Sequence, residues 1–491
     1  MQFNSFQYIF LLFITVGIYY LLPLLGQKLL LVIVSFGFYM AWNVKYSLLM
    51  ATVILLTYFA AIFMIKKPQY KRLLFFGSLL SVLGLLFYFK YFNFFLDTLN
   101  QVFGANFSML NIILPVGISF YVFQSIGYLA DVYTNNEECE KSLLNYALFI
   151  SFFPQLVAGP IERSKNMLTQ FNTKQVFDVQ NIKNGLTLVL VGLVQKVVIA
   201  DRLALYVNAV FANYQQASRA ALIVAVVFFA FQVYCDFNAY SLIAIGSAKT
   251  MGYTLMRNFN HPYLSRSFAE YWSRWHISLS TWFQDYIFTP FVWTNPLKKL
   301  GKFFTAPPMV LGLLLVFTVS GFWHGASWTF VVWGLLHGAF RIFEALTAKA
   351  KKKFYKKHAI RPNHPILVVV EVSIVFLLNC FTYVFFRADS MGQAMGYIQG
   401  ILFGTSTNGI YSDILGVKPG EITLCFVIIG ALVLLEILGE IFCKNISFDV
   451  ILQQKNVVVQ SVVYAALLLI LVVFGMYGVS YVENPFIYFQ F

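Results

Sequence analysis

The chain has 491 residues, of which 59% are hydrophobic, 19% are aromatic and only 11% are charged. Soluble proteins average about 25% charged residues, and the mean hydropathy of this chain is +0.73. A soluble globule of this size would lack the polar side chains that cover its surface. The composition therefore excludes an ordinary soluble enzyme, a disordered protein and a nucleic-acid-binding domain, and it predicts a membrane protein.

The formal net charge of +14 does not point to nucleic acid, because much of it lies in short segments between apolar runs. Positive charge in such segments marks the cytoplasmic side of a membrane. The five cysteines form no CxxC pair, so we expect neither a disulfide framework nor a zinc site. No metal cofactor is predicted.

Apolar runs of about 20 residues, the length that crosses a membrane, recur along the chain. Their continuity favours helices, because a barrel strand alternates every second residue. The sequence therefore predicts an all-α polytopic integral membrane protein. The runs lie at 6–25, 29–48, 48–65, 73–95, 182–200, 219–247, 307–323, 326–346, 366–386, 422–442 and 457–479.

Two further segments are not simple spans. The stretch 112–158 is apolar but is interrupted by prolines and glycines, and broken helices at membrane depth occur where they line a cavity or are buried in protein. The stretch 258–295 is amphipathic. At 100° per residue, Trp272, Trp275 and Trp282 share one face of a helix, which predicts a re-entrant or interfacial element.

Two basic clusters set the expected orientation. The first follows the third span, and the second precedes the span at 366–386. Both are expected in cytoplasmic loops, so counting spans outward places the N-terminus and the C-terminus outside. The alternative for both clusters is docking of lipid headgroups or of an acidic carrier protein. The clusters comprise Lys66, Lys67, Lys71, Arg72, Lys349, Lys351, Lys352, Lys353, Lys356, Lys357 and Arg361.

His324 is the most informative of the six histidines. It ends an apolar run and lies between Gly321 and Gly325, which permit close backbone approach. Burial disfavours the charged imidazole, and a neutral imidazole accepts a proton from a hydroxyl as a general base must. The alternative is a structural histidine that forms hydrogen bonds between helices.

His276 lies at the edge of the tryptophan stripe, two residues after Arg274. Either this segment only anchors the protein at the membrane interface, or its polar side chains line a cavity. His337 and His261 are expected to be structural. Asp236 lies inside an apolar run, where a carboxylate needs a partner; Arg257, Arg274 or a helix N-terminus are the expected choices.

The motifs resemble the membrane-bound O-acyltransferase family, in particular its bacterial branch that acylates cell-surface polymers. That branch includes alginate O-acetylation proteins, peptidoglycan O-acetyltransferases and teichoic-acid D-alanyl transferases. The similarity runs over roughly residues 1–345, and the tail also matches. The matching segments are Phe322–Trp328, Trp272–Trp282, Leu114–Phe120, Phe153–Ile161, Tyr234–Phe237 and Pro262–Leu264.

The resemblance implies about 10–12 transmembrane helices, with re-entrant helices around a central tunnel. It also implies one membrane domain over residues 1–491. That domain would consist of N-terminal spans at 1–110, a catalytic core at 111–345, C-terminal spans at 346–485 and an aromatic tail at 486–491.

The resemblance places two histidines in the tunnel, the presumed base at His324 and the second at His276. Arg274, Asp236 and Trp323 are candidate contacts for the donor or the substrate. The expected donor is acetyl-CoA, with an acyl carrier protein as the alternative. The acyl group would leave on the outer side of the inner or cytoplasmic membrane, through a partner of the SGNH type or another esterase fold.

The tail Phe486–Phe491 resembles the C-terminal tail of the same branch. Either it is an aromatic anchor at the interface, or the Tyr488 hydroxyl takes the acyl group from the donor and passes it to the partner. The expected activity is O-acetyl transfer to an extracytoplasmic polysaccharide or peptidoglycan. The alternatives are D-alanyl transfer to teichoic acid, a transporter of glycan precursors and a non-catalytic scaffold.

Overall fold

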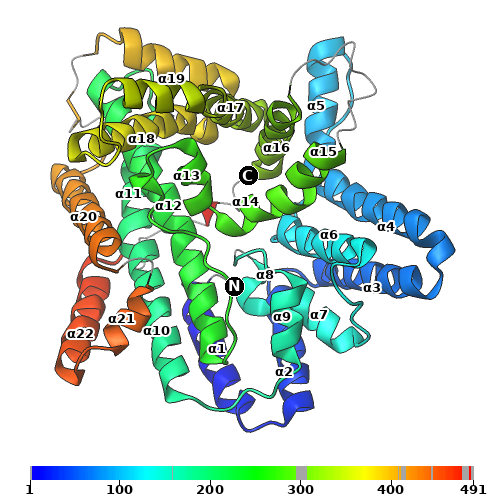
Figure 1. Cartoon of the computed structure of the whole chain (residues 1–491). Helices are drawn as coiled ribbons and strands as arrows, with labels where there is room; N and C mark the ends of the chain where they lie inside the picture. The colour runs from blue at the N-terminus through cyan, green and yellow to red at the C-terminus, as the bar shows by residue number, and fades with distance from the viewer. Residues whose placement is uncertain are drawn as a thin grey trace. The chain divides into compact units, whose positions relative to one another are not determined.

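The computed structural model describes residues 3–157, 159–294, 307–406, 409–410, 416–443, 446–477 and 486–487. All the regular secondary structure within these ranges is helical, and they contain no strand (Figure 1). The prediction of an all-α protein is therefore confirmed.

In the described part of the chain, seven helical segments are long and apolar enough to cross a membrane, which confirms a multi-pass integral membrane protein. Four of them are α3 (Val44–Lys66), α12 (Arg219–Thr250), α17 (Trp328–Lys357) and α18 (Pro365–Arg387). The others are η1–α4–η2–α5 (Pro68–Phe103), α20 with most of η8 (Pro419–Phe442), and α22 (Val457–Phe474). Three shorter apolar helices are α1 (Phe6–Tyr19), α2 (Leu24–Met40) and α16 (Pro308–His324).

The described residues form two compact units, Met1–Leu193 with Ala239–Arg257, and Val194–Asn238 with Asn258–Phe491. The chain passes from one unit to the other within α12. The organisation into one membrane domain stays a prediction.

The first unit brings two of the motif segments into contact. Gly117 precedes α6 with a φ of 75°, and a Cβ at this position would lie 2.6 Å from the carbonyl oxygen of Leu156. Only glycine combines this conformation with so close an approach. The other helices of this unit are α6 (Ile118–Thr134), α7 (Leu143–Ser151), α8 (Phe153–Leu156), α9 (Ser164–Phe171) and α10 (Val179–Leu193).

The amphipathic segment of the second unit is broken, not one continuous helix. Its helices are η4 (Pro262–Leu264), α13 (Phe268–Arg274), α14 (Ile277–Phe283), η5 (Gln284–Phe288) and α15 (Thr289–Thr294). The predicted tryptophan stripe required one continuous helix through Trp275 and His276. This prediction is wrong, because α13 ends at Arg274 and α14 begins at Ile277. His276 has the left-handed φ of 43°, which ends one helix and starts the next.

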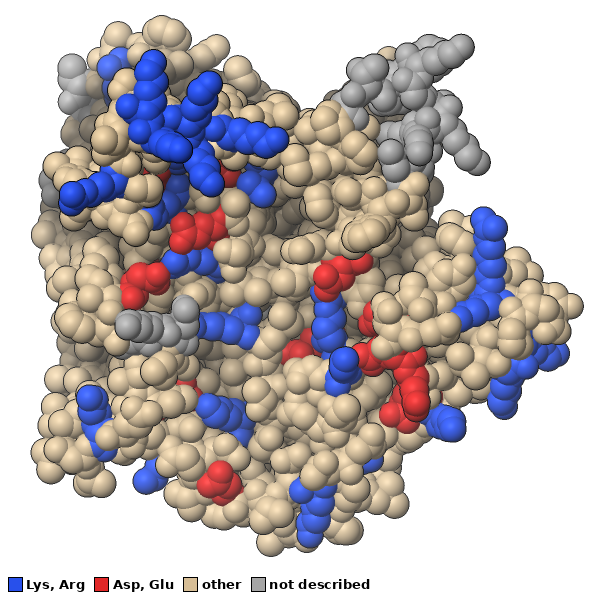
Figure 2. All heavy atoms as spheres, in the orientation of Figure 1, with Lys and Arg blue, Asp and Glu red and all other residues tan. Residues whose placement is uncertain are grey.

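The second basic cluster lies mostly on a helix, so the expected loop is wrong for Lys349–Lys357. These residues form the end of α17. Lysine has a high helix propensity, and positive charge is favourable near a helix C-terminus. On the visible face in Figure 2, basic side chains gather in the region where Figure 1 places α17 and α18.

Helices α16 and α17 form a close antiparallel pair in the second unit. A Cβ at Gly321 would lie 2.5 Å from the carbonyl oxygen of Phe330, and a Cβ at Gly334 would overlap the carbonyl oxygen of Phe317. Small residues permit such backbone contact between membrane helices. The remaining elements of this unit are η3 (Val194–Ala200), α11 (Asp201–Ala212), α19 (Met391–Phe403) and α21 (Phe448–Gln453).

Replacement of Gly334 tests this helix contact. We expect Gly334→Ala to lower the free energy of unfolding by about 1–3 kcal/mol, the usual penalty for overpacking. Thermal unfolding of the purified protein in detergent measures the change. Gly430→Ala is the matched control, because a Cβ at Gly430 meets no atom within 4 Å. Equal melting temperatures for the two variants would contradict the close contact.

Candidate functional site

His324 ends α16 inside a group of aromatic rings. Its side chain is buried, and its ring centroid lies 5.0 Å from Trp323, 4.7 Å from Trp333 and 5.4 Å from Phe386. These rings come from α16, α17 and α18, so three helices define the position of the imidazole.

His276 belongs to the same group of rings. Its ring centroid lies 5.6 Å from Trp323 and 4.6 Å from Phe237 on α12. Trp323 therefore contacts both histidines. We call Phe237, His276, Trp323, His324, Trp333 and Phe386 the aromatic cluster. Two histidines 48 positions apart in the sequence thus lie in one apolar environment of the second unit.

The turn that carries His276 is held by a neighbouring extended segment. The backbone amide of Asn260 donates to the carbonyl of Arg274 at 2.9 Å, and the amide of Ile277 donates to the carbonyl of Asn258 at 2.9 Å. These bonds offset the strain of a left-handed non-glycine residue, which costs of order 1–3 kcal/mol. The position of His276 is therefore set by the backbone on both sides of it.

The Asn258 side chain orients the His276 ring. Its Oδ1 accepts from the Ser278 amide at 3.3 Å and from the Ser278 hydroxyl at 2.9 Å, and it lies 3.2 Å from His276 Nδ1. The two Ser278 contacts identify this atom as an acceptor, so Nδ1 carries the proton. In the neutral ring, Nε2 then has the basic lone pair.

Burial lowers the pKa of His276 to about 3. The imidazole is consequently neutral at physiological pH, because desolvation penalises the charged form. A neutral ring is the form that accepts a proton or a hydrogen bond from a hydroxyl. Sequence reasoning missed Asn258, which lies 18 positions before His276 and carries no motif signal of its own.

Arg274 lies close to His276 in sequence but forms ion pairs with two carboxylates. Its Nη2 lies 2.7 Å from Glu270 and 2.9 Å from Glu440, and Nη1 also donates to Glu440 at 3.0 Å. Such a bidentate pair is among the stronger charge-assisted contacts. The role of Arg274 as a donor contact stays a prediction.

Asp236 pairs with Lys196, a partner that the sequence did not suggest, whereas the expected partner Arg274 pairs with Glu270 and Glu440. Lys196 Nζ lies 2.8 Å from Asp236 and 2.8 Å from Asp201, and the three side chains are buried. Lys196 and Asp236 are 40 positions apart in sequence, and only the packing of η3 against α12 within the second unit brings them together.

The described part of the tail, Phe486 and Ile487, lies beside Asp236 and the aromatic cluster. The amide of Ile487 donates to Asp236 Oδ2 at 2.8 Å, and the ring of Phe486 lies 5.6 Å from that of Phe237. Both tail residues are buried. Tyr488, the predicted acyl carrier, lies outside the described residues.

His337 and His261 were expected to be structural, and both make contacts of that kind. His337 Nε2 is 3.0 Å from the Thr382 hydroxyl, and its ring packs against Trp333 at 4.7 Å. His261 precedes the short helix η4. Among the residues that the structure describes, no three His, Cys, Asp or Glu side chains gather as metal ligands would.

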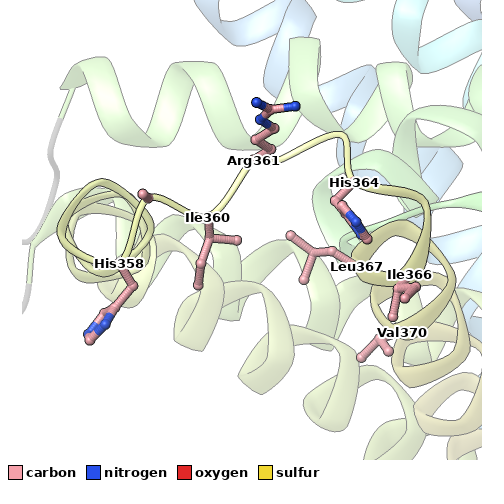
Figure 3. A pocket seen from close by; sticks show the side chains of 8 residues that line it. His358, Ile360, Arg361, His364, Ile366, Leu367 and Val370 are labelled. Carbon is pink, nitrogen blue, oxygen red and sulfur yellow. The ribbon is translucent and has the colours of Figure 1, made fainter.

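A shallow pocket of about 530 Å³ lies at the connection between α17 and α18, apart from the aromatic cluster. Figure 3 shows its lining, with Arg361 pointing away from Leu367. The lining residues are His358, Ala359, Ile360, Arg361, His364, Ile366, Leu367 and Val370. The pocket therefore belongs to the exposed basic end of α17 and contains neither motif histidine.

Comparison with known proteins identifies the family. The pattern of the membrane-bound O-acyltransferase family matches residues 140–386. The chain is 35% identical over 406 residues to a peptidoglycan O-acetyltransferase of Helicobacter pylori. The aligned region covers 77% of this chain and 74% of that protein. It is 35% identical over 445 residues to a probable alginate O-acetylase AlgI of Pseudomonas aeruginosa. This match covers 88% of this chain and 81% of that protein.

A teichoic acid D-alanyltransferase of Bacillus subtilis is more distant, at 26% identity over 283 residues, covering 56% of this chain and 69% of that protein. The family match includes both histidines of the aromatic cluster. The chain therefore belongs to the membrane-bound O-acyltransferase family and is an acyltransferase.

Proposed function

We propose that this enzyme transfers an acetyl group from acetyl-CoA toward hydroxyl groups of an extracytoplasmic polysaccharide or peptidoglycan. The observation that carries the proposal is the aromatic cluster, in which a buried His324 and a neutral His276 contact the same tryptophan. The choice of acetyl and of a surface polymer rests on the names of the relatives.

His324 acts as the general base in this proposal. It takes the proton from the attacking hydroxyl while the hydroxyl oxygen bonds to the thioester carbon. The C–S bond then breaks, and the proton passes to the thiolate that leaves as coenzyme A. An ester forms and a thiol is released, so the reaction needs no further oxidant or co-reactant.

His276 orients the acceptor in the same proposal. Because Asn258 fixes the proton on Nδ1, Nε2 serves as a hydrogen-bond acceptor for a hydroxyl. Correct orientation of a reacting hydroxyl accelerates transfer strongly, and a displacement of 1 Å costs about 100-fold. Asn258 is therefore a positioning residue. The ring of Trp323 packs against both histidines.

The donor approaches from the cytoplasmic side in this scheme, at the basic end of α17. The exposed lysines there suit a ligand that carries phosphate groups, whether acetyl-CoA or the phosphopantetheine of a carrier protein. In the proposal, this end of α17 lies in the cytoplasm, as expected for a basic cluster, and both termini lie outside. The membrane would be the bacterial inner or cytoplasmic membrane.

A separate exported partner would complete the transfer to the polymer. In the proposal, Tyr488 carries the acyl group from the donor to that partner, an enzyme of the SGNH type or another esterase fold. Two contacts of the residues that precede Tyr488 support this role. Its neighbour Ile487 is bonded to Asp236, and Phe486 packs against Phe237, which itself contacts His276.

Replacement of His324 tests the base. We expect His324→Gln to lower acetyl transfer at least about 100-fold, the usual contribution of general base catalysis. The assay follows labelled acetyl-CoA with the purified protein in lipid vesicles, together with its partner and a polymer fragment.

His337→Gln is the matched control, because His337 is equally buried but bonds to Thr382, a contact that glutamine preserves. It should keep transfer within about threefold, since this histidine makes no proposed contact with the reactants. If His324→Gln retains full transfer, the base assignment falls and a transporter or scaffold role gains support. Consumption of a D-alanyl carrier protein in place of acetyl-CoA would favour the alternative donor.

Asn258→Ala tests the orientation of His276. We expect transfer to fall about 10- to 100-fold, because the ring loses the acceptor that fixes its tautomer and angle. Asn379→Ala is the control; Asn379 is also fully buried, but its amide bonds to Val375 of its own helix. Comparable thermal stability with unequal activity would separate positioning from folding. Equal activity of the two variants would contradict the role of Asn258.

Tyr488→Phe tests the acyl relay. The variant keeps the ring but lacks the hydroxyl that would accept the acyl group, so transfer to the polymer should cease. With labelled donor and no partner, the unmodified chain should accumulate label at Tyr488, as read by peptide mass spectrometry. Undiminished transfer by Tyr488→Phe would eliminate the relay while leaving the assignment of His324 intact.

A further inference from the structure

Three charged side chains lie together in the interior of the second unit. Lys196 Nζ is 2.8 Å from Asp201 Oδ1 and 2.8 Å from Asp236 Oδ1. The exposed fraction of each of the three side chains is at most 5%. We call Asp201, Lys196 and Asp236 the buried triad.

The local backbone explains why Lys196 meets Asp201. Lys196 lies in η3, which is a π-helix, and Asp201 is the first residue of α11. A π-helix pairs residue i with residue i+5, so these two side chains lie over each other. Such single-turn π segments are frequent at functional sites. Asp236 then approaches the lysine from α12.

Burying three charges costs desolvation free energy, and the attraction between the lysine and the two carboxylates offsets only part of it. Several kcal/mol of desolvation per ion is recovered only when the geometry is good and the remaining lone pairs are satisfied. Asp236 Oδ2 obtains such a partner from outside the triad, the backbone amide of Ile487 at 2.8 Å. The last described residues of the chain thus complete the hydrogen bonding of Asp236.

Two earlier points of the C-terminal chain are also tied to the same region. The amide of Met476 donates to the carbonyl of Val197 in η3 at 3.0 Å. Arg202, next to Asp201, donates to the carbonyl of Phe474 at 2.6 Å. Chain ends are commonly loose unless they are tied down, and here η3 and the start of α11 supply ties near Phe474 and Met476.

We propose that the buried triad is the anchor of the C-terminal tail. Asp236 holds the Ile487 amide, and Lys196 is a positioning residue that fixes the orientation of the Asp236 side chain. The anchored residues are Phe486 and Ile487, and the evidence for the anchor is their contacts with Phe237 and Asp236. Its use in catalysis rests on the proposed function, because the proposed acyl carrier Tyr488 directly follows Ile487 in the sequence.

The experiment measures the accessibility of residue 487 directly. Ile487→Cys is the reference chain, since a backbone amide is retained at that position. The purified protein in lipid nanodiscs is treated with a small maleimide, and labelling at each cysteine is followed by peptide mass spectrometry. The buried Cys380 reports on global unfolding in every sample.

Two charge-matched double variants isolate the hydrogen bond. Lys196→Met with Asp236→Asn and Lys196→Met with Asp236→Leu both leave the triad positions with a formal charge of −1, as in the native chain. Asparagine keeps an oxygen that accepts from the Ile487 amide, whereas leucine of similar size does not. We expect labelling at position 487 to be at least about tenfold faster in the leucine variant, with Cys380 protected in both.

The single variant Lys196→Met tests the positioning role. Without the ammonium group, two buried carboxylates remain with no cation between them, so Asp236 is no longer held in place. We expect labelling at position 487 to accelerate about tenfold over the reference chain. Glu371→Gln is the control; it removes an ion pair with Arg266 and Lys351 and should leave position 487 protected.

Three results would overturn the proposal. Equal labelling in the asparagine and leucine variants would remove Asp236 as the tie, and unchanged labelling in Lys196→Met would remove the positioning role of the lysine. Equal acceleration by Glu371→Gln would reduce the effect to general loosening. The relay is judged separately by Tyr488→Phe, so an anchored tail with normal transfer by that variant retains the anchor and rejects the relay.

Discussion

The hydrogen bonds between Asn258 and the turn at His276 are the constraint on which the site depends. Without them the left-handed backbone at His276 would be unfavourable, and α13 could continue into α14 as one helix. The ring would then leave its contacts with Phe237 and Trp323. One asparagine therefore sets the chain path, the tautomer and the orientation of the imidazole together.

Interactions local in sequence were predictable, whereas those between distant elements were not. Apolar runs gave the helices, because membrane burial needs only a continuous stretch of suitable length. The motifs singled out His324 and His276, which the structure brings into one cluster. Asn258 and Lys196 escaped prediction, since their partners lie 18 and 40 positions away. The break at His276 escaped because a helical wheel assumes an unbroken helix.

The second unit fixes polar groups in an apolar interior in two different ways. His276 is held neutral, with one amide acceptor and aromatic neighbours. Asp236 is held beside an ammonium group and a backbone amide. A neutral ring suits a group that accepts a hydrogen bond from a hydroxyl, and ion pairing suits a group whose position must not change. Phe237, the residue after Asp236, connects the two groups, because its ring contacts His276 on one side and Phe486 of the tail on the other.

The aromatic cluster also bears on the choice between transfer and hydrolysis. A thioester reacts with water as well as with an alcohol, so an acyltransferase must keep water from the base that activates the acceptor. Bulky rings around His324 leave little room for solvent, and their rigidity comes from packing between α16, α17 and α18. In the proposed function, the glycine contacts that draw α16 and α17 together would therefore limit hydrolysis of the donor as well as stabilise the fold.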